Sequence, residues 1–388
     1  MTAKKDATAA RSAPRAGDVA ESAAGSDPRI ARLTSVRAEL AANGLDAILV
    51  SSPANIRYLS GFSGSSALLV VSLDRAVLIT DFRYRTQARA EVDGAAEVEI
   101  EGTSLWTRLW AVVPRLPGVS RLAFESPHLR HVDYQRLMDG GSRWQWRPTT
   151  GIVEALRQRK DPGELVQIRR AVAIAEQALE ATVPEIRSGL TELEVGGILE
   201  RSLRECGSEA FPFETIVASG ERSALPHAHC SARKLRPGDL LIVDFGATAG
   251  GYCSDITRTF VVGAASAEQR EAYEAVREAN ATAAAGLRAG MRGREADALA
   301  RDHLERCGFG AEFGHSLGHG IGLEVHEAPR LAMTAEAPLP PGSVVTVEPG
   351  IYREGWGGIR IEDDVLVGPE GPVVLTSFPR ELVELRVG

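Results

Sequence analysis

The sequence lacks the features that mark several classes of protein. No apolar run approaches the ~18 residues of a membrane-spanning helix, so no membrane span is expected. Acidic residues outnumber basic ones by 52 to 44, and no basic stripe is present, which argues against a nucleic-acid partner. Only four cysteines occur, none in CxxC spacing, and this low density predicts reduced thiols and a cytoplasmic location rather than a disulfide framework.

Residues 1–28 lack both hydrophobic periodicity and the apolar core of a secretory signal. We expect them to form a flexible tail. The rest of the composition is ordinary for a soluble globular protein, because the 388-residue chain is 44% apolar and 25% charged. A chain of this length has room for roughly two or three domains.

Residues 29–150 alternate between helical and strand-like segments, which predicts a small α/β domain. Residues 55–65 are polar and punctuated by glycine, so a loop is expected there. The domain holds no cluster of candidate ligands. Its expected role is structural, or it covers a site on another domain or subunit through residues 58–65. The expected helices are residues 30–43, 84–92, 105–113 and 129–138, and the expected strands are 47–50, 67–71 and 76–80, with others near Val98, Leu122 and Trp146.

Residues 151–160 are expected to form a linker into a second domain, residues 161–388. Helix starts in this domain carry capping signals, at Asp161, Thr191 and Ser266, each followed three residues later by Glu or Gln. Strand-like segments alternate with these helices. The pattern predicts an α+β domain with helices outside and a curved antiparallel sheet inside.

The first chemical signal is a pair of acids in residues 235–260. An apolar run ends on Asp244, a small-residue turn follows, and a second run begins at Asp255. This pattern predicts a β-hairpin, and a turn centred on Ala249 and Gly250 sets the two acids directly opposite each other. Directly paired residues have Cβ atoms roughly 5 Å apart, so the carboxylates repel unless a proton or a cation intervenes. The pair alone fits either an acid/base dyad or a metal site.

A second copy of the pattern decides between them. Residues 339–350 align without a gap with residues 235–246, and Glu348 falls on Asp244. A hairpin centred on Gly355 sets Glu348 opposite Glu362. The match extends upstream through both preceding helices, which predicts two helix-helix-hairpin halves with the site between them. Four converging carboxylates carry about four negative charges, which two divalent cations neutralise.

Residues 314–327 hold three of the eight histidines together with four glycines. Glycine weakens a strand and lets other groups approach the backbone closely, and histidine is costly in a dry core. The segment is therefore a candidate part of the site, with His315, His319 and His326 as candidates to supply one nitrogen ligand to a cation. His227, just upstream of the first hairpin, is a separate candidate.

These residues carry a family resemblance. Asp244 ends the apolar run before the first turn, and Asp255, His319, Glu348 and Glu362 lie within SDITRT, GHGIGLEVHE, EPGIY and RIED. This set of five residues resembles that of the pita-bread metallopeptidases. The NIRYLSGFSGS segment and the two-domain layout resemble the aminopeptidase P/prolidase branch, which cleaves Xaa–Pro bonds. The resemblance implies a pita-bread catalytic domain preceded by a smaller creatinase-like α/β domain.

The resemblance also implies roles for the site residues. All five would bind two divalent metals, with Asp255 and Glu362 bridging them, Asp244 on one metal, and His319 and Glu348 on the other. Manganese is the first expectation, and zinc or cobalt also suits one imidazole and four carboxylates. The implied partner is a proline-containing peptide, whether dipeptide or longer, and homodimers are common in the family.

The expected mechanism is attack on the scissile carbonyl by a water that both metals acidify towards hydroxide. Glu348 would relay its proton and His326 would donate to the oxyanion. His227 and His315 would orient the proline side and help protonate the leaving imide nitrogen. Arg360 would help to orient the Glu362 carboxylate, unless it is an ordinary surface arginine. There are three alternatives: a creatinase-like amidinohydrolase, a methionine aminopeptidase and a non-catalytic peptide-binding module. The intact ligand set argues against the amidinohydrolase and the binding module. The domain before residue 150 argues against a methionine aminopeptidase, which would not need it.

Overall fold

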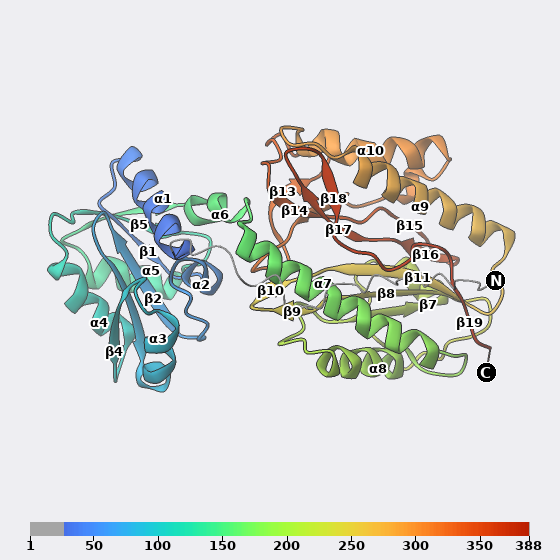
Figure 1. Ribbon diagram of the computed structural model, residues 1–388, viewed down its shortest axis with the longest axis horizontal. Coiled ribbons are helices and arrows are strands. Elements are labelled where there is room, and N and C mark those ends of the chain that lie inside the picture. Colours follow the sequence, from blue (N-terminus) through green and yellow to red (C-terminus); the bar gives the residue numbers. More distant parts are fainter. Residues whose placement is uncertain (1–26, 388) are drawn as a thin grey trace, which may run out of the picture.

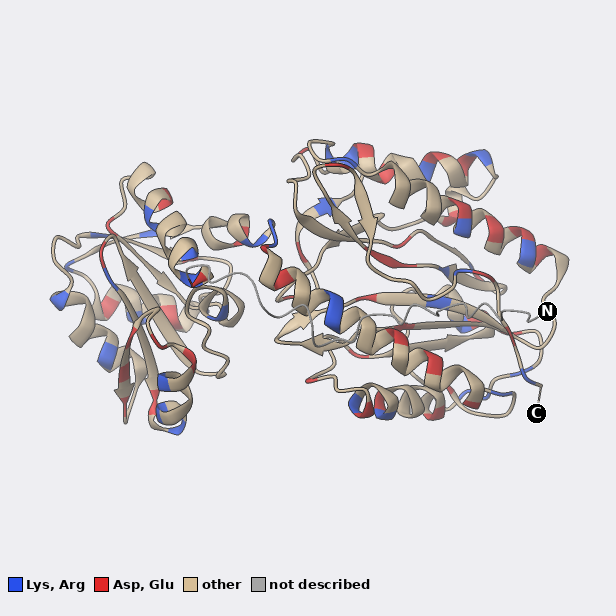
Figure 2. Cartoon of the chain, viewed as in Figure 1, with Lys and Arg blue, Asp and Glu red and all other residues tan. Residues whose placement is uncertain are grey.

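The computed structural model describes residues 27–387, so the predicted tail over residues 1–28 lies almost entirely outside the described residues. Figure 1 shows two units side by side, a smaller one coloured blue to cyan and a larger one coloured green to red. Helix α6 (Ile152–Arg157) lies between them, and α7 (Pro162–Thr182) begins at the junction and runs along the larger unit. Acidic and basic residues are interspersed along the helices of both units (Figure 2). Within residues 27–387, no helix combines the length and apolarity needed to cross a membrane.

The smaller unit contains one six-stranded sheet in the order β4-β3-β2-β1-β5-β6. The first strand lies inside the sheet, pairing antiparallel with β2 and parallel with β5, and all four of its residues are buried. Apolar clusters cover both faces of the sheet, one with Leu33 and Leu40, the other with Leu109 and Leu137. This is the layered arrangement that alternating helices and strands predict.

The elements of the smaller unit lie close to their predicted positions. The strands are β1 Ala47–Val50, β2 Ala67–Ser72, β3 Ala76–Asp81, β4 Glu97–Glu101, β5 Arg121–Glu125 and β6 Gln145–Thr149. The helices are α1 Pro28–Ala42, α2 Pro53–Ser60, α3 Arg85–Glu91, α4 Leu105–Val112 and α5 His131–Gly140.

One sequence prediction about this unit is wrong. Most of the expected loop over residues 55–65 is the end of α2, because the Ser52 side chain caps the helix, Pro53 occupies its first turn and Gly61 ends it at φ 81°. The expected linker over residues 151–160 contains α6, a short helix whose Val153 and Arg157 are buried.

The larger unit places two helix pairs on opposite sides of its strands, with α7 and α8 on one side and α9 and α10 on the other (Figure 1). Separate apolar clusters join α7 and α8 to β8 and β11, and α9 and α10 to β14 and β17. The two halves therefore repeat one packing scheme, as the duplicated sequence predicts. The predicted capping boxes at Asp161, Thr191 and Ser266 are present.

The bounds of the larger unit's elements follow. The helices after α7 are α8 Glu192–Glu205, α9 Ala267–Gly286 and α10 Gly293–Arg306. The strands are β7 Ile216–Ser219, β8 Leu240–Phe245, β9 Thr248–Ala249, β10 Tyr252–Cys253, β11 Ile256–Val262, β12 Gly318–Gly320, β13 Glu327–Leu331, β14 Ser343–Val347, β15 Gly350–Arg353, β16 Gly357–Arg360, β17 Asp363–Val367, β18 Pro372–Val374 and β19 Glu384–Leu385.

The first hairpin has a different register from the predicted one. Asp244 pairs with Thr257, so Asp255 is its diagonal neighbour on the same face rather than its direct partner. The reason is the turn. Gly250 and Gly251 both have positive φ, 55° and 79°, as a two-residue type I′ turn requires, and this moves the hairpin centre by one residue.

The second hairpin has the predicted register. Gly350 pairs with Arg360 around a turn that contains Gly355, and Val347 pairs with Asp363 on the adjoining ladder. Because both ladders continue one register, Glu348 and Glu362 lie opposite each other between them.

Candidate metal centre

Five strand-borne side chains converge on one cavity of about 780 Å³ in the larger unit. Asp244 lies near the end of β8, and Asp255 immediately precedes β11. His319 is the middle residue of the short strand β12. Glu348 directly follows β14, and Glu362 lies between β16 and β17. The two duplicated hairpins and the histidine segment thus meet at the same place, as the sequence predicts.

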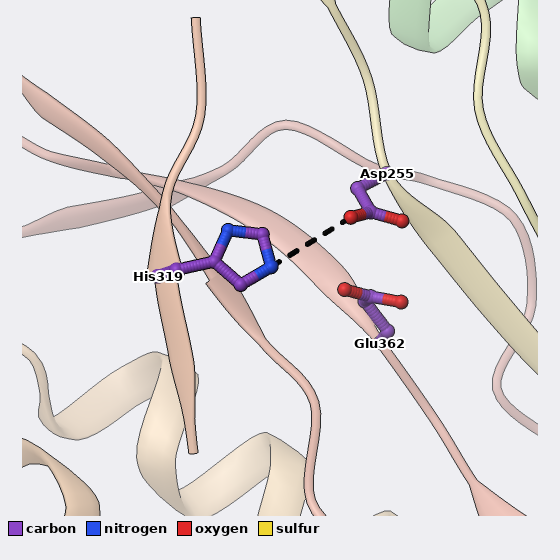
Figure 3. A group of neighbouring side chains, drawn as sticks. All are labelled: Asp255, His319 and Glu362. Atoms are coloured by element: carbon purple, nitrogen blue, oxygen red, sulfur yellow. Dashed lines mark ion pairs between the residues drawn. The ribbon is translucent and has the colours of Figure 1, made fainter. Parts of the chain in front are cut away.

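Three of these side chains present their ligand atoms to one point. The imidazole of His319 and the carboxylates of Asp255 and Glu362 each offer an atom within 4.8 Å of the others (Figure 3). His319 Nε2 lies 3.8 Å from Asp255 Oδ2 and 3.4 Å from Glu348 Oε1. The arrangement is a compact group of oxygen atoms with a single nitrogen.

His319 is held as a nitrogen ligand would be. Its Nδ1 lies 3.1 Å from the carbonyl oxygen of Gly320, so this nitrogen carries the proton that the carbonyl accepts. The lone pair of Nε2 then faces the carboxylates. Burial lowers the pKa of His319 to about 4, so the ring is neutral at physiological pH and cannot balance their charge.

The carboxylates are held close enough to disfavour joint ionisation. Burial, followed by the charges of the neighbouring acids, raises the pKa values of Asp255 and Glu362 well above the ordinary range. Burial also raises the pKa of Glu348 to about 8. A cation among these groups would favour their charged forms, since an opposite charge at this range lowers a carboxyl pKa.

Arg360 contacts Asp244 directly and reaches Glu362 through Thr257. Its Nη2 donates to Asp244 Oδ2 at 2.5 Å, and its Nε donates to Thr257 Oγ1 at 3.1 Å. The Thr257 hydroxyl donates in turn to Glu362 at 2.6 Å. The guanidinium also donates to the Tyr352 hydroxyl at 2.7 Å. Arg360 therefore orients Asp244 in this structure.

The donor set fits divalent cations. Asp244 Oδ1 is buried and accepts no hydrogen bond from residues 27–387, while its other oxygen is held by Arg360. A buried carboxylate oxygen without a donor is costly unless another partner satisfies it. Carboxylate oxygens with one imidazole nitrogen suit manganese, zinc or cobalt. The residues present are therefore compatible with metal bound by Asp244, Asp255, His319, Glu348 and Glu362.

The other three candidate histidines also line the cavity. His315 Nε2 lies 3.0 Å from the Tyr352 hydroxyl, which joins this ring to Arg360 and Asp244. The rings of His326 and His319 are 4.3 Å apart. His227 lies on the wall beside Pro226 and Ala228.

Sequence reasoning missed several residues at the site. Tyr352 lies in the EPGIY motif but gave no signal by itself, because a lone tyrosine in a strand is common. Thr257 and Thr346 donate to Glu362 and Glu348, at 2.6 Å and 3.2 Å, and alternation along each strand could have placed them on the carboxylate face. Arg330 lines the cavity opposite His319 across the β12–β13 ladder.

A wide cavity between duplicated halves, walled by four buried or half-buried acids and an imidazole, defines a pita-bread metallopeptidase. The model for metallopeptidase family M24 matches residues 166–369, and the creatinase/prolidase N-terminal domain matches residues 32–159. The chain belongs to metallopeptidase family M24. The predicted fold class, a creatinase-like α/β domain followed by a pita-bread domain, is confirmed; the predicted borders after residues 28, 150 and 160 stay predictions.

Relatives match almost the whole chain. The sequence is 42% identical to an uncharacterized peptidase, YqhT, of Bacillus subtilis, over 88% of this chain and 96% of that protein. It is 35% identical to an Xaa-Pro dipeptidase of Pyrococcus furiosus, over 88% and 96%. Among solved structures, an Xaa-Pro dipeptidase from Bacillus anthracis matches with TM-score 0.88 and 41% identity over 92% of this chain and all of that one. An X-Pro aminopeptidase from Thermotoga maritima matches with TM-score 0.85 and 38% identity, over 91% and 99%.

Proposed function

We propose that this metallopeptidase hydrolyses the peptide bond between an N-terminal residue and proline, using two divalent metal ions held by Asp244, Asp255, His319, Glu348 and Glu362. The observation that carries the proposal is the convergence of these five side chains, from both duplicated halves, on one cavity. Relatives named both Xaa-Pro dipeptidase and X-Pro aminopeptidase support the same bond specificity.

When bound, two divalent cations supply a polarised carbonyl and an acidified water. With metal bound, the Glu348 carboxylate would stay ionised, because a nearby cation lowers the pKa of a carboxyl group, and it would accept the proton of that water on a carboxylate oxygen. When the peptide bond breaks, the same proton must be transferred to the leaving nitrogen of proline. His326, beside His319, donates to the developing oxyanion.

The remaining groups orient the substrate. The Asp244–Arg360–Tyr352–His315 chain of contacts fixes the His315 ring at the cavity wall. His227 faces the proline side with it. A bond to proline offers no N–H for recognition, so specificity must come from fit to the ring. The apolar wall that suits the ring consists of Phe213, Ile216, Pro226 and Ala228.

Manganese is the proposed metal, because oxygen atoms dominate the donor set. The homodimer and the cytoplasmic location that the sequence suggests stay predictions as well. The proposal leaves the length of the peptide open, so both a dipeptide and a longer peptide belong to the test.

The experiment measures bound metal and bond specificity together. Purified chain is stripped of metal, reloaded with manganese, zinc or cobalt in turn, and assayed on an Xaa-Pro dipeptide, an Xaa-Pro-Yaa tripeptide and an Xaa-Ala dipeptide. About two ions per chain and preference for the proline substrates are expected. Failure to hold two ions, or equal cleavage of the alanine peptide, would contradict the proposal.

A further inference from the structure

Glu327 directly follows His326, and two buried cations hold its carboxylate. Arg157 Nη2 lies 2.5 Å from Glu327 Oε2, and Lys160 Nζ lies 2.5 Å from Oε1. The three side chains are 2%, 1% and 6% exposed. Buried charges are costly unless they are paired with good geometry. Because each carboxylate oxygen meets a different cation, the side chain is fixed in both position and rotation.

The contacts continue from Arg157 into the smaller unit. Arg157 Nη1 donates to Asn55 Oδ1 at 2.8 Å, and Asn55 is fully buried in α2. The Asn55 amide donates in turn to Glu125 Oε1 at 2.6 Å, at the end of β5. Glu125 also accepts from the backbone N–H of Ser52 at 2.7 Å. An unbroken line of buried contacts therefore joins the six-stranded sheet to Glu327.

Glu327 also lies at a bulge in the strands that carry the histidines. Glu327 pairs with Gly320, and the adjacent pair along the ladder is His319 with Arg330. One step along β12 therefore corresponds to several residues of β13, and the extra residues of β13 form the bulge. A β-bulge bends its strand and re-aims nearby side chains. The strands approach closely here, since a Cβ on Gly320 would lie 2.3 Å from the Ala328 carbonyl oxygen. Fixing Glu327 thus fixes His326 before it and His319 across the ladder.

We propose that Glu327 is a positioning residue, through which the smaller unit holds His326 and His319 in the arrangement that hydrolysis requires. The smaller unit then acts on the site within its own chain, through buried contacts with Arg157, in addition to any covering role. The inference rests on the proposed function.

The test compares Glu327→Gln, which keeps the shape and removes the charge, with Glu324→Gln. Glu324 contacts the same guanidinium at 2.8 Å but is 40% exposed and does not adjoin a histidine. Glu327→Gln is expected to lower kcat by about 10- to 100-fold with little change in KM, as for other residues that orient a site's ligands. Glu324→Gln is expected to retain the wild-type kcat.

A double-mutant cycle tests the line of contacts. Arg157→Met and Glu327→Gln should be non-additive in kcat/KM, because each breaks the same contact. Asn55→Ala, in the smaller unit, should also lower kcat, but by a smaller factor than Glu327→Gln. If Glu327→Gln does not fold, Arg157→Lys replaces it, since lysine keeps the charge but cannot contact Asn55 and Glu327 together.

Imidazole NMR with labelled histidine supplies a readout independent of activity, and the chain has eight histidines to assign. The resonances of His326 and His319 should shift in Glu327→Gln and stay in place in Glu324→Gln. Unchanged resonances together with a kcat within about twofold of wild type, or equal losses in the two variants, would overturn the inference. If the wild-type chain cleaves no Xaa–Pro bond, the proposed function fails, while the resonances still report on positioning.

Discussion

Removing the charge of Glu348 should change how the stability of the metal-free protein depends on pH. Burial raises the pKa of this carboxyl from 4.5 to about 8 in the folded chain. Between these values the folded state keeps a proton that the unfolded state has lost. The contribution of this carboxyl to the free energy of unfolding is fully present below pH 4.5, and it is lost as the pH rises towards 8.

One retained proton corresponds to about 1.4 kcal/mol per pH unit, so the loss between pH 5 and pH 8 is on the order of 4 kcal/mol. Glu348→Gln should remove this part of the pH dependence, leaving the fall caused by Asp255 and Glu362. The variant should therefore gain stability relative to wild type as the pH rises. Because a divalent cation takes the place of the retained protons, metal should flatten the wild-type curve.

The assay is urea unfolding in the presence of a chelator at several pH values from 5 to 8, repeated with manganese added. Glu354→Gln is the matched control, because Glu354 lies exposed in the turn of the same hairpin. The control should follow the wild-type curve. The reasoning would be refuted if metal-free wild type and Glu348→Gln lost stability equally with rising pH.

Further outcomes follow from the site. Asp255→Asn should abolish turnover and reduce the bound metal, with the fold retained by circular dichroism; retained activity would refute a bridging role. Arg360→Met should lower kcat by about 10- to 100-fold, because Asp244 loses its orienting donor, and an unchanged kcat would show that the contact is dispensable. Gly318→Ala should lower both stability and activity, because the added Cβ would lie 2.1 Å from a backbone oxygen of β14. Gly314→Ala is the control and should behave as wild type, because a Cβ at that position has no other atom within 4 Å. Chelation should lower the unfolding midpoint of wild type, because binding at 100 times Kd stabilises by about 2.7 kcal/mol.

The predicted site depended on local patterns and on one comparison within the chain. Alternation and glycine turns located the two hairpins, and the alignment of Glu348 with Asp244 located the second pair of acids. The duplication predicted two similar halves, and the family resemblance supplied the pita-bread fold class. The first hairpin's register was missed by one residue on each strand, because two adjacent glycines, rather than Ala249 and Gly250, adopt the positive φ of the turn.

Contacts between distant segments gave no sequence signal. Arg360 lies two residues from Glu362 and was expected to help orient it, but alternation along the strand does not say which other carboxylate this long side chain will reach. The fold places Asp244, 116 positions away in sequence, within 2.5 Å of the guanidinium. The contact between Arg157 and Glu327 spans 170 positions and joins two units that the sequence divides by a linker.

The sequence by itself determined which groups are candidates for the chemistry: strand periodicity and internal duplication located four acids, since both patterns are local properties of the chain, and the family resemblance singled out His319 among the histidines of residues 314–327. The tertiary structure decided how those groups are held. Hydrogen-bond partners, the bulge beside His319 and the buried cations around Glu327 depend on which distant side chains the packed core brings within reach, and no local pattern encodes that distance.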